Sequence, residues 1–373
     1  MSERHSEEFG ALLRQALAHH QAGRLAEAET LYRKILQNNP CHSEALRLLG
    51  ALARQRGESD AALNFLERAL RSNPNSAWAC FDLARLEIDR KEIDAAVPLL
   101  ERAVQLQPVF PEAHHALGNA YAACWFLDKA IASYRQALAQ NPGLAGMGDA
   151  IAFVERQARE VSALADQIQR AIHEPVNRTF ASRLAGCALE TRELFPHLLN
   201  QLGLIGTGVE VGVRKGQFSE HLLQHWQGRL LFSVDPWREF SQREYQDSAN
   251  VSQANQDQLC CDTIKRLMRY AGRSVIWRMT SREAAPLVPD GSLDFCYVDA
   301  DHSYEAVRED IQLWHPKVKP GGILGGHDYI ADGSYSFGTF GVQSAVNEFA
   351  NAHNLEPIIT KEAPFRSWFV VKV

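Results

Sequence analysis

The stretch GVEVGVRKGQF at 208–218 decides the fold of the C-terminal half of this chain of 373 residues. Its β-branched residues predict a short buried strand, and the glycines that follow predict a tight turn into a helix. Gly212 lets the backbone turn sharply after the strand, and Gly216 lets ligand atoms lie against the main chain where the helix begins. A purely structural turn gives the same pattern, so this stretch on its own leaves the function open.

Similar apolar, β-branched runs continue toward the C-terminus and are separated by segments that suit helices. They predict four more strands, at 229–235, 274–279, 293–299 and 321–328. Two late strands, EPIIT at 356–360 and SWFVVKV at 367–373, predict a hairpin that adds antiparallel to the edge of the sheet. Residues 186–373 are therefore expected to form a doubly wound α/β sheet of seven strands, which binds its ligand at the carboxyl ends of the parallel strands.

Asp235 ends the second predicted strand, where a carboxylate can accept hydrogen bonds from both hydroxyls of a ribose. Dinucleotide-binding enzymes share this feature. They also carry a GxGxxG turn that cradles a pyrophosphate, and GVEVGVRKGQF lacks it. The pattern therefore favours a nucleoside cofactor without a pyrophosphate.

Three segments occur in the order typical of class I S-adenosylmethionine-dependent methyltransferases: GVEVGVRKGQF, SVDPW and YVDADHSYEAVREDIQLWHPKVKPGGILGGHDY. Residues 208–373 resemble this family along nearly their whole length. The last segment is similar to caffeoyl-coenzyme A and catechol O-methyltransferases and to bacterial sugar O-methyltransferases. The resemblance implies an enzyme that uses S-adenosylmethionine, with O-methylation of a sugar, glycan or other small molecule as the leading hypothesis.

The resemblance also implies which residues bind the cofactor. Glu210, Gly212 and Gly216 would border its methionine part, Asp235 would hold the ribose, and Trp237 would flank the adenosine. Thr280 and Ser281 follow the third predicted strand, in the region that usually meets the adenine, although no acidic residue stands next to them in the sequence.

For the chemistry, the resemblance points to Asp299 at the end of the fourth strand and to His327 and Asp328 after the fifth. In the similar enzymes, carboxylates at these places hold a divalent cation such as magnesium or manganese. His327 departs from that pattern, so two hypotheses stay open: a cation bound by these three residues, or an Asp299 that only contacts the cofactor while His327 hydrogen-bonds substrate or caps a loop.

His302 stands where the similar enzymes carry a basic lysine, and we predict that it is the general base because imidazole accepts a proton near neutral pH. Asp301 either orients that ring or joins the metal. The polar stretch at 238–266 predicts a lid over the substrate, with Tyr245 and the segment 332–341 as walls of the site.

The N-terminal half repeats with a period of 34 residues, seen in Pro40, Pro74, Pro108 and Pro142. At one position of the repeat the residues are small, namely Ala16, Gly50, Ala84 and Gly118, and at another they are bulky, namely Tyr32, Leu66, Leu100 and Tyr134. Residues 7–142 resemble four tetratricopeptide repeats, which implies an all-α solenoid of helix pairs.

Residues 143–185 are expected to hold a capping helix at 151–172 and a linker to the second domain. The repeats would bind a partner protein, or serve as a spacer or a surface for self-association. If they recruit the substrate, the protein modifies polypeptides. A third hypothesis is an adaptor without catalysis that senses the cofactor.

The composition narrows the classes of function further. A formal net charge of -6 argues against nucleic acid as a partner, because phosphate binding usually leaves a basic footprint. The seven cysteines are an odd number without a CxxC spacing, which favours packing residues over disulfides or zinc. No apolar run is long enough to span a bilayer and no secretory signal is evident, so we expect a cytoplasmic protein.

Overall fold

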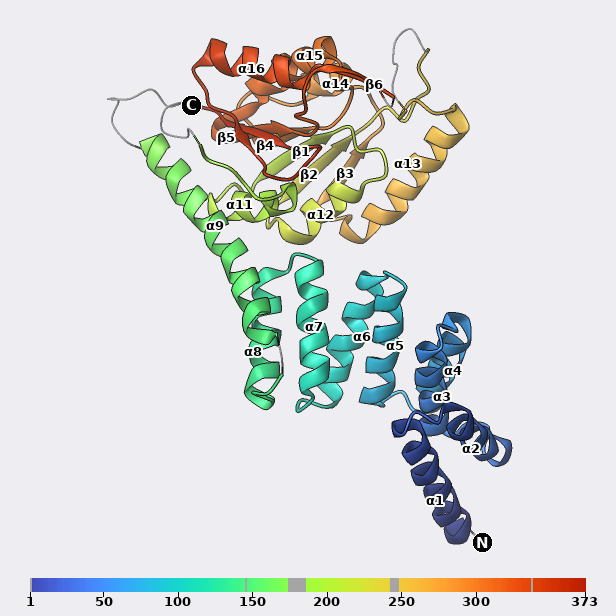
Figure 1. The fold of residues 1–373 in the computed structure, drawn as a ribbon. Helices are drawn as coiled ribbons and strands as arrows, with labels where there is room; N and C mark the ends of the chain where they lie inside the picture. Colours follow the sequence, from blue (N-terminus) through green and yellow to red (C-terminus); the bar gives the residue numbers. More distant parts are fainter. Residues whose placement is uncertain (1, 145, 174–185, 242–247, 337) are drawn as a thin grey trace. The chain divides into compact units, whose positions relative to one another are not determined.

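The computed structural model describes residues 2–144, 146–173, 186–241, 248–336 and 338–373. The chain forms two compact units, residues 1–156 and 157–373. Helices make up the described part of the first unit, whereas the second contains a seven-stranded sheet (Figure 1). Most of the expected linker, and with it the expected start of the second domain, falls at 174–185, outside the described residues.

The first unit is built from consecutive helical hairpins, which confirms the predicted solenoid. In each hairpin two helices joined by a short turn pack against each other, and the second helix also packs on the next hairpin. The pairs are α1 (Ser2–Gln21) with α2 (Leu25–Asn38), α3 (Ser43–Gln55) with α4 (Ser59–Ser72), α5 (Ala77–Asp89) with α6 (Ile93–Leu106), and α7 (Pro111–Ala123) with α8 (Leu127–Gln140).

The small and bulky positions of the repeat meet inside the hairpins. A Cβ added to Gly50 would lie 2.6 Å from the Cγ of Leu66, and one added to Gly118 would lie 2.4 Å from the Cδ1 of Tyr134. Leu66 is completely buried and Tyr134 almost so. The glycines therefore let the two helices approach closely while the bulky side chain fills the space between them.

Helix α9 (Met147–His173) covers the predicted capping helix at 151–172. The division between the two units falls inside it, after Arg156. Its C-terminal part belongs to the second unit, where the side-chain amide of Gln169 donates to the carbonyl of Leu202 at 3.4 Å.

The second unit holds the predicted seven-stranded sheet, in the order β3-β2-β1-β4-β5-β9-β8. The first five strands in this order pair in parallel, whereas β9 pairs antiparallel with both β5 and β8. The strands are β1 (Thr207–Val211), β2 (Leu230–Val234), β3 (Ser274–Trp277), β4 (Leu293–Val298), β5 (Val318–Gly326), β8 (Ile358–Ile359) and β9 (Trp368–Val371).

Helices cover both faces of this sheet (Figure 1), as a doubly wound fold requires. On one side lie α11 (Phe195–Gln201) and α12 (Gln217–His225), and on the other lie α15 (Tyr304–Trp314) and α16 (Val342–His353). Strand β4 is buried throughout, and its side chains alternate between the two layers. Phe295 and Tyr297 contact aromatic rings of α11 and α12, whereas Cys296 and Val298 belong to the core formed with α15 and α16.

Two segments differ from the expected loops. The polar stretch at 238–266 was expected to be a lid, but its second half belongs to α13 (Gln253–Leu267). Residues 242–247, and with them the proposed wall residue Tyr245, lie outside the described residues. The other expected wall, 332–341, forms a small hairpin of β6 (Gly333–Tyr335) and β7 (Gly338–Phe340). Within the described residues, no helix combines the length and apolar character needed to cross a bilayer.

Candidate active site

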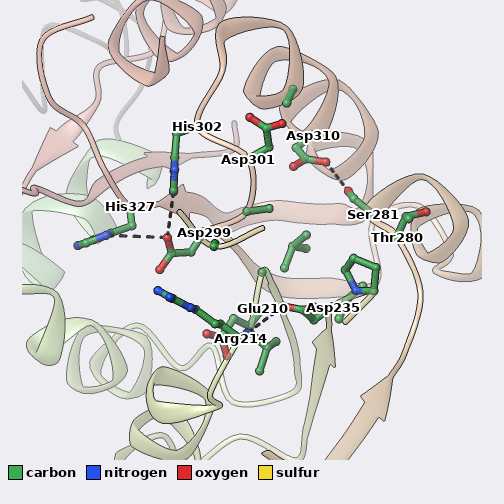
Figure 2. A pocket seen from close by; sticks show the side chains of 18 of the residues that line it. Glu210, Arg214, Asp235, Thr280, Ser281, Asp299, Asp301, His302, Asp310 and His327 are labelled. Carbon is green, nitrogen blue, oxygen red and sulfur yellow. Dashed lines mark hydrogen bonds and ion pairs between the residues drawn. The ribbon is translucent and has the colours of Figure 1, made fainter. Parts of the chain in front are cut away.

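A cavity of about 940 Å³ opens at the carboxyl ends of the parallel strands in the second unit. It collects the segments that follow β1, β2, β4 and β5, together with the start of the short helix α14 (Ser281–Ala284) (Figure 2). Most of the residues expected in the site line this cavity: Glu210, Gly212, Asp235, Thr280, Ser281, Asp299, His302, His327 and Asp328.

Gly212 lines the cavity, and its conformation is one that only glycine adopts easily. Its φ is +87°, and a Cβ added there would lie 2.0 Å from the carbonyl oxygen of Asp299. The loop after β1 therefore packs directly on the main chain after β4. Any side chain at this position would push the two segments apart.

Asp235 is held in place by the backbone of two loops. Its Oδ2 accepts the N–H of Arg214 at 2.8 Å, and its Oδ1 accepts the N–H of Trp237 at 2.7 Å. Burial raises the pKa of Asp235, while these N–H bonds oppose that rise. The carboxylate thus lines the cavity in one orientation, with lone pairs left for a ligand.

Two residues expected to contact the cofactor do not line the cavity. The Trp237 ring is completely buried with Val213 and Cys260, and its Nε1 donates to the carbonyl of Arg214 at 2.9 Å. Gly216 begins α12 with φ of +69°, and a Cβ there would meet the side chain of Thr263 at 2.8 Å. Both residues shape the loops around the cavity, and Pro236 lines it where Trp237 was expected.

Glu210 lies at the end of β1, 2% exposed, and accepts a hydrogen bond from the hydroxyl of Ser219. Burial raises its pKa to about 8, although the Ser219 hydrogen bond acts in the opposite direction. The positive charge of Arg192 also lowers this pKa. Burial thus favours the protonated form of Glu210, whereas a nearby cation favours the ionised form.

At the other end of the cavity, Thr280 and Ser281 begin α14. Thr280 forms a capping box with Glu283, so its hydroxyl is used by the helix. The hydroxyl of Ser281 donates to the carboxylate of Asp310 and accepts the indole N–H of Trp314 at 2.7 Å. Burial raises the pKa of Asp310 to about 7. Asp310 on α15 thus places a buried carboxyl group beside Ser281 in the cavity lining.

Asp299, His302, His327 and Asp328 form one cluster of charged and polar side chains. The Oδ1 of Asp299 lies 3.8 Å from the Nε2 of His302 and 3.9 Å from the Nδ1 of His327, and Figure 2 shows both rings directed at this carboxylate. Asp328 is closer to both rings, 2.8 Å from the Nε2 of His302 and 3.2 Å from the Nδ1 of His327.

Asp328 is strained and strongly ionised. Its φ of +58° lies in the left-handed region, which is costly for a residue with a side chain. Burial by itself would raise the pKa of Asp328, but the hydrogen bonds and the charges of the two histidines together outweigh burial and hold this pKa well below its usual range. The strained turn after β5 therefore delivers a carboxylate to the histidines.

The ring of His302 is fixed from a second side by the β6–β7 hairpin. Phe340 stacks on it with the ring centroids 4.7 Å apart and an angle of 2° between the planes, and the N–H of Gly341 donates to the carbonyl of His302 at 2.8 Å. Phe340 lines the cavity, so part of the expected wall at 332–341 is present. Asp301 accepts the N–H of Ser303 at 2.8 Å and so supports the turn into α15.

The geometry differs in one respect from the expected cation site. The three residues whose ligand atoms lie within 4.8 Å of one another are Asp299, His302 and Asp328, with His302 in the place expected for His327. Oxygen and imidazole ligands suit several divalent ions. The imidazole ring of His302 is therefore a candidate both for the general base and for a metal ligand.

Arg192 also lines the cavity, although the sequence did not predict it. It reaches the cavity from the short 3-10 helix η1 (Arg192–Leu194), which lies before the first strand. Its Nη1 lies 3.6 Å from the Oδ2 of Asp299, and its guanidinium lies over the ring of Phe218 at 5.0 Å. No glycine turn or strand end marks this position. Only the fold brings it to the cavity.

Family models match both halves of the chain. A model described as a methyltransferase domain matches residues 209–329, and tetratricopeptide repeat models match residues 2–41, 13–77, 53–120 and 111–144. No curated protein matches the chain. The protein therefore combines tetratricopeptide repeats with a methyltransferase domain.

Several solved structures are similar to part of the chain. Two structures of MamA are 26% and 24% identical, cover 38% and 46% of this chain and 82% and 99% of theirs, and have TM-scores of 0.35 and 0.36. YrrB, described as a TPR protein with an unusual peptide-binding site, is 22% identical, covers 40% of this chain and 76% of its own, and has a TM-score of 0.35.

Proposed function

We propose that the protein transfers the methyl group of S-adenosylmethionine to a hydroxyl group of a sugar, glycan or other small molecule. One observation carries this proposal: a single cavity brings together the glycine turn after β1, a backbone-held carboxylate after β2 and the cluster around Asp299. The match to a methyltransferase domain supports the general class of reaction.

The residues of the cavity fit the parts of this cofactor in order. Asp235 would accept hydrogen bonds from the ribose hydroxyls, since both of its oxygens are fixed and still line the cavity. Asp310 and Ser281 would lie at the adenine end, where an acidic group can accept a hydrogen bond from the exocyclic amine. Without a Cβ, Gly212 lets the loop after β1 lie directly against the main chain of Asp299, so both segments line one cavity.

His302 is the proposed general base. The cofactor supplies an electrophilic methyl carbon. Transfer of that methyl group would join the acceptor oxygen to its carbon and leave the electrons of the former carbon–sulfur bond on sulfur, and the imidazole of His302 would take the proton of the hydroxyl. Asp328 at 2.8 Å and Asp299 at 3.8 Å from its Nε2 stabilise the imidazolium that forms.

The same three residues also fit a divalent cation. Asp299, His302 and Asp328 would hold it, and a cation at that place lowers the pKa of a bound hydroxyl. His302 cannot act as a ligand and as a free base at once, so a chelator separates the two mechanisms. We expect turnover to survive chelation. Loss of turnover that manganese or magnesium restores would instead assign His302 to the metal.

Calorimetry with S-adenosylmethionine tests the foundation of this proposal. We expect one site per chain with micromolar affinity and binding of S-adenosylhomocysteine in the same range. If the cofactor does not bind even at high micromolar concentration, the proposed function is wrong. Assays over pools of sugars, phenols and peptides then identify the class of acceptor.

A second candidate function is methylation of a polypeptide that the repeats recruit. The matches to tetratricopeptide models support it, since repeats of this kind present extended surfaces to partner proteins. The acceptor pools distinguish the two functions: peptide turnover without any turnover of sugars and phenols would favour the second.

A further inference from the structure

Arg192 is a cation that the fold holds firmly in the wall of the cavity. Its main-chain N–H donates to the carboxylate of Glu362 at 3.0 and 3.2 Å, and Glu362 also accepts the hydroxyl of Thr360 at 2.9 Å. The hydroxyl of Thr191 accepts the N–H of Glu193 at 3.2 Å and so begins the same turn. The C-terminal hairpin thus fixes a residue that stands before the first strand of the sheet.

The guanidinium itself is positioned but still has donors to offer. It lies over the ring of Phe218, with its central carbon 5.0 Å from the ring centroid. Among the described residues, the carboxylates nearest to its nitrogens, Asp299 and Glu193, are both 3.6 Å away, beyond direct hydrogen-bond distance. An arginine prepared in this way can bind a planar carboxylate through two parallel hydrogen bonds.

Asp299 separates this cation from the reacting groups. Its Oδ1 faces the two histidines, whereas its Oδ2 faces Arg192. Glu210 lines the same cavity as Arg192, and in Figure 2 it lies below Asp299 while His302 lies above. A guanidinium and a carboxyl group that line one side of the cavity together match the two charged groups of an α-amino acid.

The charge of the whole cavity supports the same conclusion. Acidic side chains outnumber basic ones in its lining, which suits a ligand with net positive charge such as S-adenosylmethionine. That ligand has one anionic group, its α-carboxylate. Of the basic residues in the lining, Arg192 is half-buried, whereas Arg214, Lys215, Arg238 and Arg282 are exposed.

We propose that Arg192 binds the α-carboxylate of S-adenosylmethionine while Glu210 receives its ammonium group. This inference rests on the proposed function and names how the same site recognises the amino-acid end of its cofactor. An acceptor molecule with a carboxylate of its own is the competing source of the same chemistry, and it would leave cofactor affinity independent of Arg192.

The test compares S-adenosylmethionine with decarboxylated S-adenosylmethionine, which lacks only that carboxylate, by calorimetry on the full chain. We expect the wild type to prefer the complete cofactor by roughly 10- to 100-fold, as a charge-assisted pair of hydrogen bonds allows. In Arg192→Met the preference should fall below about 3-fold. Arg192→Lys, which keeps the charge without the planar fork, should retain part of it.

Arg308→Met is the matched control. Arg308 lies outside the cavity on α15 and faces Glu348 at 3.6 Å, the same separation as between Arg192 and Asp299. It should keep the wild-type preference. Equal affinity of the wild type for both ligands, or an undiminished preference in Arg192→Met, would overturn the inference while leaving the proposed function intact. If the wild type binds neither ligand, the proposed function itself fails. If Arg192→Met does not fold, the wild-type comparison still tests whether the carboxylate is recognised, and a reduced preference in Arg192→Lys still assigns that recognition to Arg192.

Discussion

At the β2 end of the cavity, Asp235 is held by backbone N–H groups, whereas at the β4 and β5 end Asp299, His302 and Asp328 are held by one another. A side chain fixed by the backbone keeps its place when its neighbours change. Side chains that fix one another respond together when one of them is removed. The first arrangement suits a group that binds, and the second suits groups that exchange a proton.

Gly212 joins the two ends, because the loop that carries it packs on the carbonyl of Asp299. Substitutions at these positions should therefore have different effects on binding and on catalysis. Changing Gly212 should damage both ends at once, changing His302 should affect only the chemistry, and changing Asp235 should affect only binding.

Gly212→Ala is expected to have the largest effect. The added Cβ would lie 2.0 Å from the carbonyl oxygen of Asp299, and its φ of +87° is strained for alanine. Cofactor binding and turnover should both become unmeasurable, and stability should fall by about 2–4 kcal/mol. Gly291→Ala is the matched control, because Gly291 has a φ of +67° but no atom within 4 Å of its added Cβ. A smaller loss for Gly212→Ala than for Gly291→Ala would contradict the packing argument.

His302→Asn should lower turnover by about 10²- to 10⁴-fold, the range of a general base, while cofactor affinity changes by less than about 3-fold. Steady-state kinetics and calorimetry on the same preparation measure the two quantities. His353→Asn, at the end of α16, is a control that should leave both unchanged. A loss of cofactor affinity as large as the loss of turnover would show that the two ends of the cavity are not separate.

Asp235→Asn should weaken cofactor binding by about 10- to 100-fold, because one charged acceptor for the ribose is lost. Turnover at saturating cofactor should stay within about 3-fold of the wild type, since the reacting cluster is untouched. Asp290→Asn changes an exposed carboxylate that pairs with Lys317 at 2.7 Å and serves as the control. Normal affinity in Asp235→Asn would remove the β2 end from the binding site.

The same contrast explains how much could be predicted from the sequence. The repeats were predictable because the contact of Gly50 with Leu66 recurs as that of Gly118 with Tyr134, so the pattern appears more than once along the chain. The strands and the residues that follow them were predictable because parallel strands deliver their carboxyl ends to one edge of the sheet.

Contacts between distant segments could not be predicted in this way. Glu362 fixes the main chain of Arg192, and Asp310 accepts a hydrogen bond from Ser281. In each case the partner lies far away in the sequence, and no local motif marks the contact. Trp237 illustrates the opposite error: it follows Asp235 at the expected place, but its ring is buried beneath the loop. A linear motif marks where the chain approaches the cavity, whereas packing decides which side chain enters it.

The last expected effect concerns stability and tests whether Glu210 is protonated in the absence of cofactor. Burial raises its pKa to about 8 in the folded chain from an ordinary 4.5. Between these values the folded chain holds a proton that the unfolded chain has lost, so the wild type should lose stability as pH rises from 4.5 to about 8. Below and above this window Glu210 adds no further pH dependence.

Glu210→Gln cannot lose that proton and keeps a partner for Ser219. Relative to the wild type it should therefore gain stability with increasing pH, by at most about 1.4 kcal/mol per pH unit, and the gain should level off above about pH 8. Thermal unfolding without cofactor between pH 5 and 9 measures the difference, and contributions from Asp310, whose pKa is also raised, cancel because both proteins retain it. Parallel curves would mean that Glu210 is already ionised in the empty cavity, and an arriving ammonium group would then displace no proton from it.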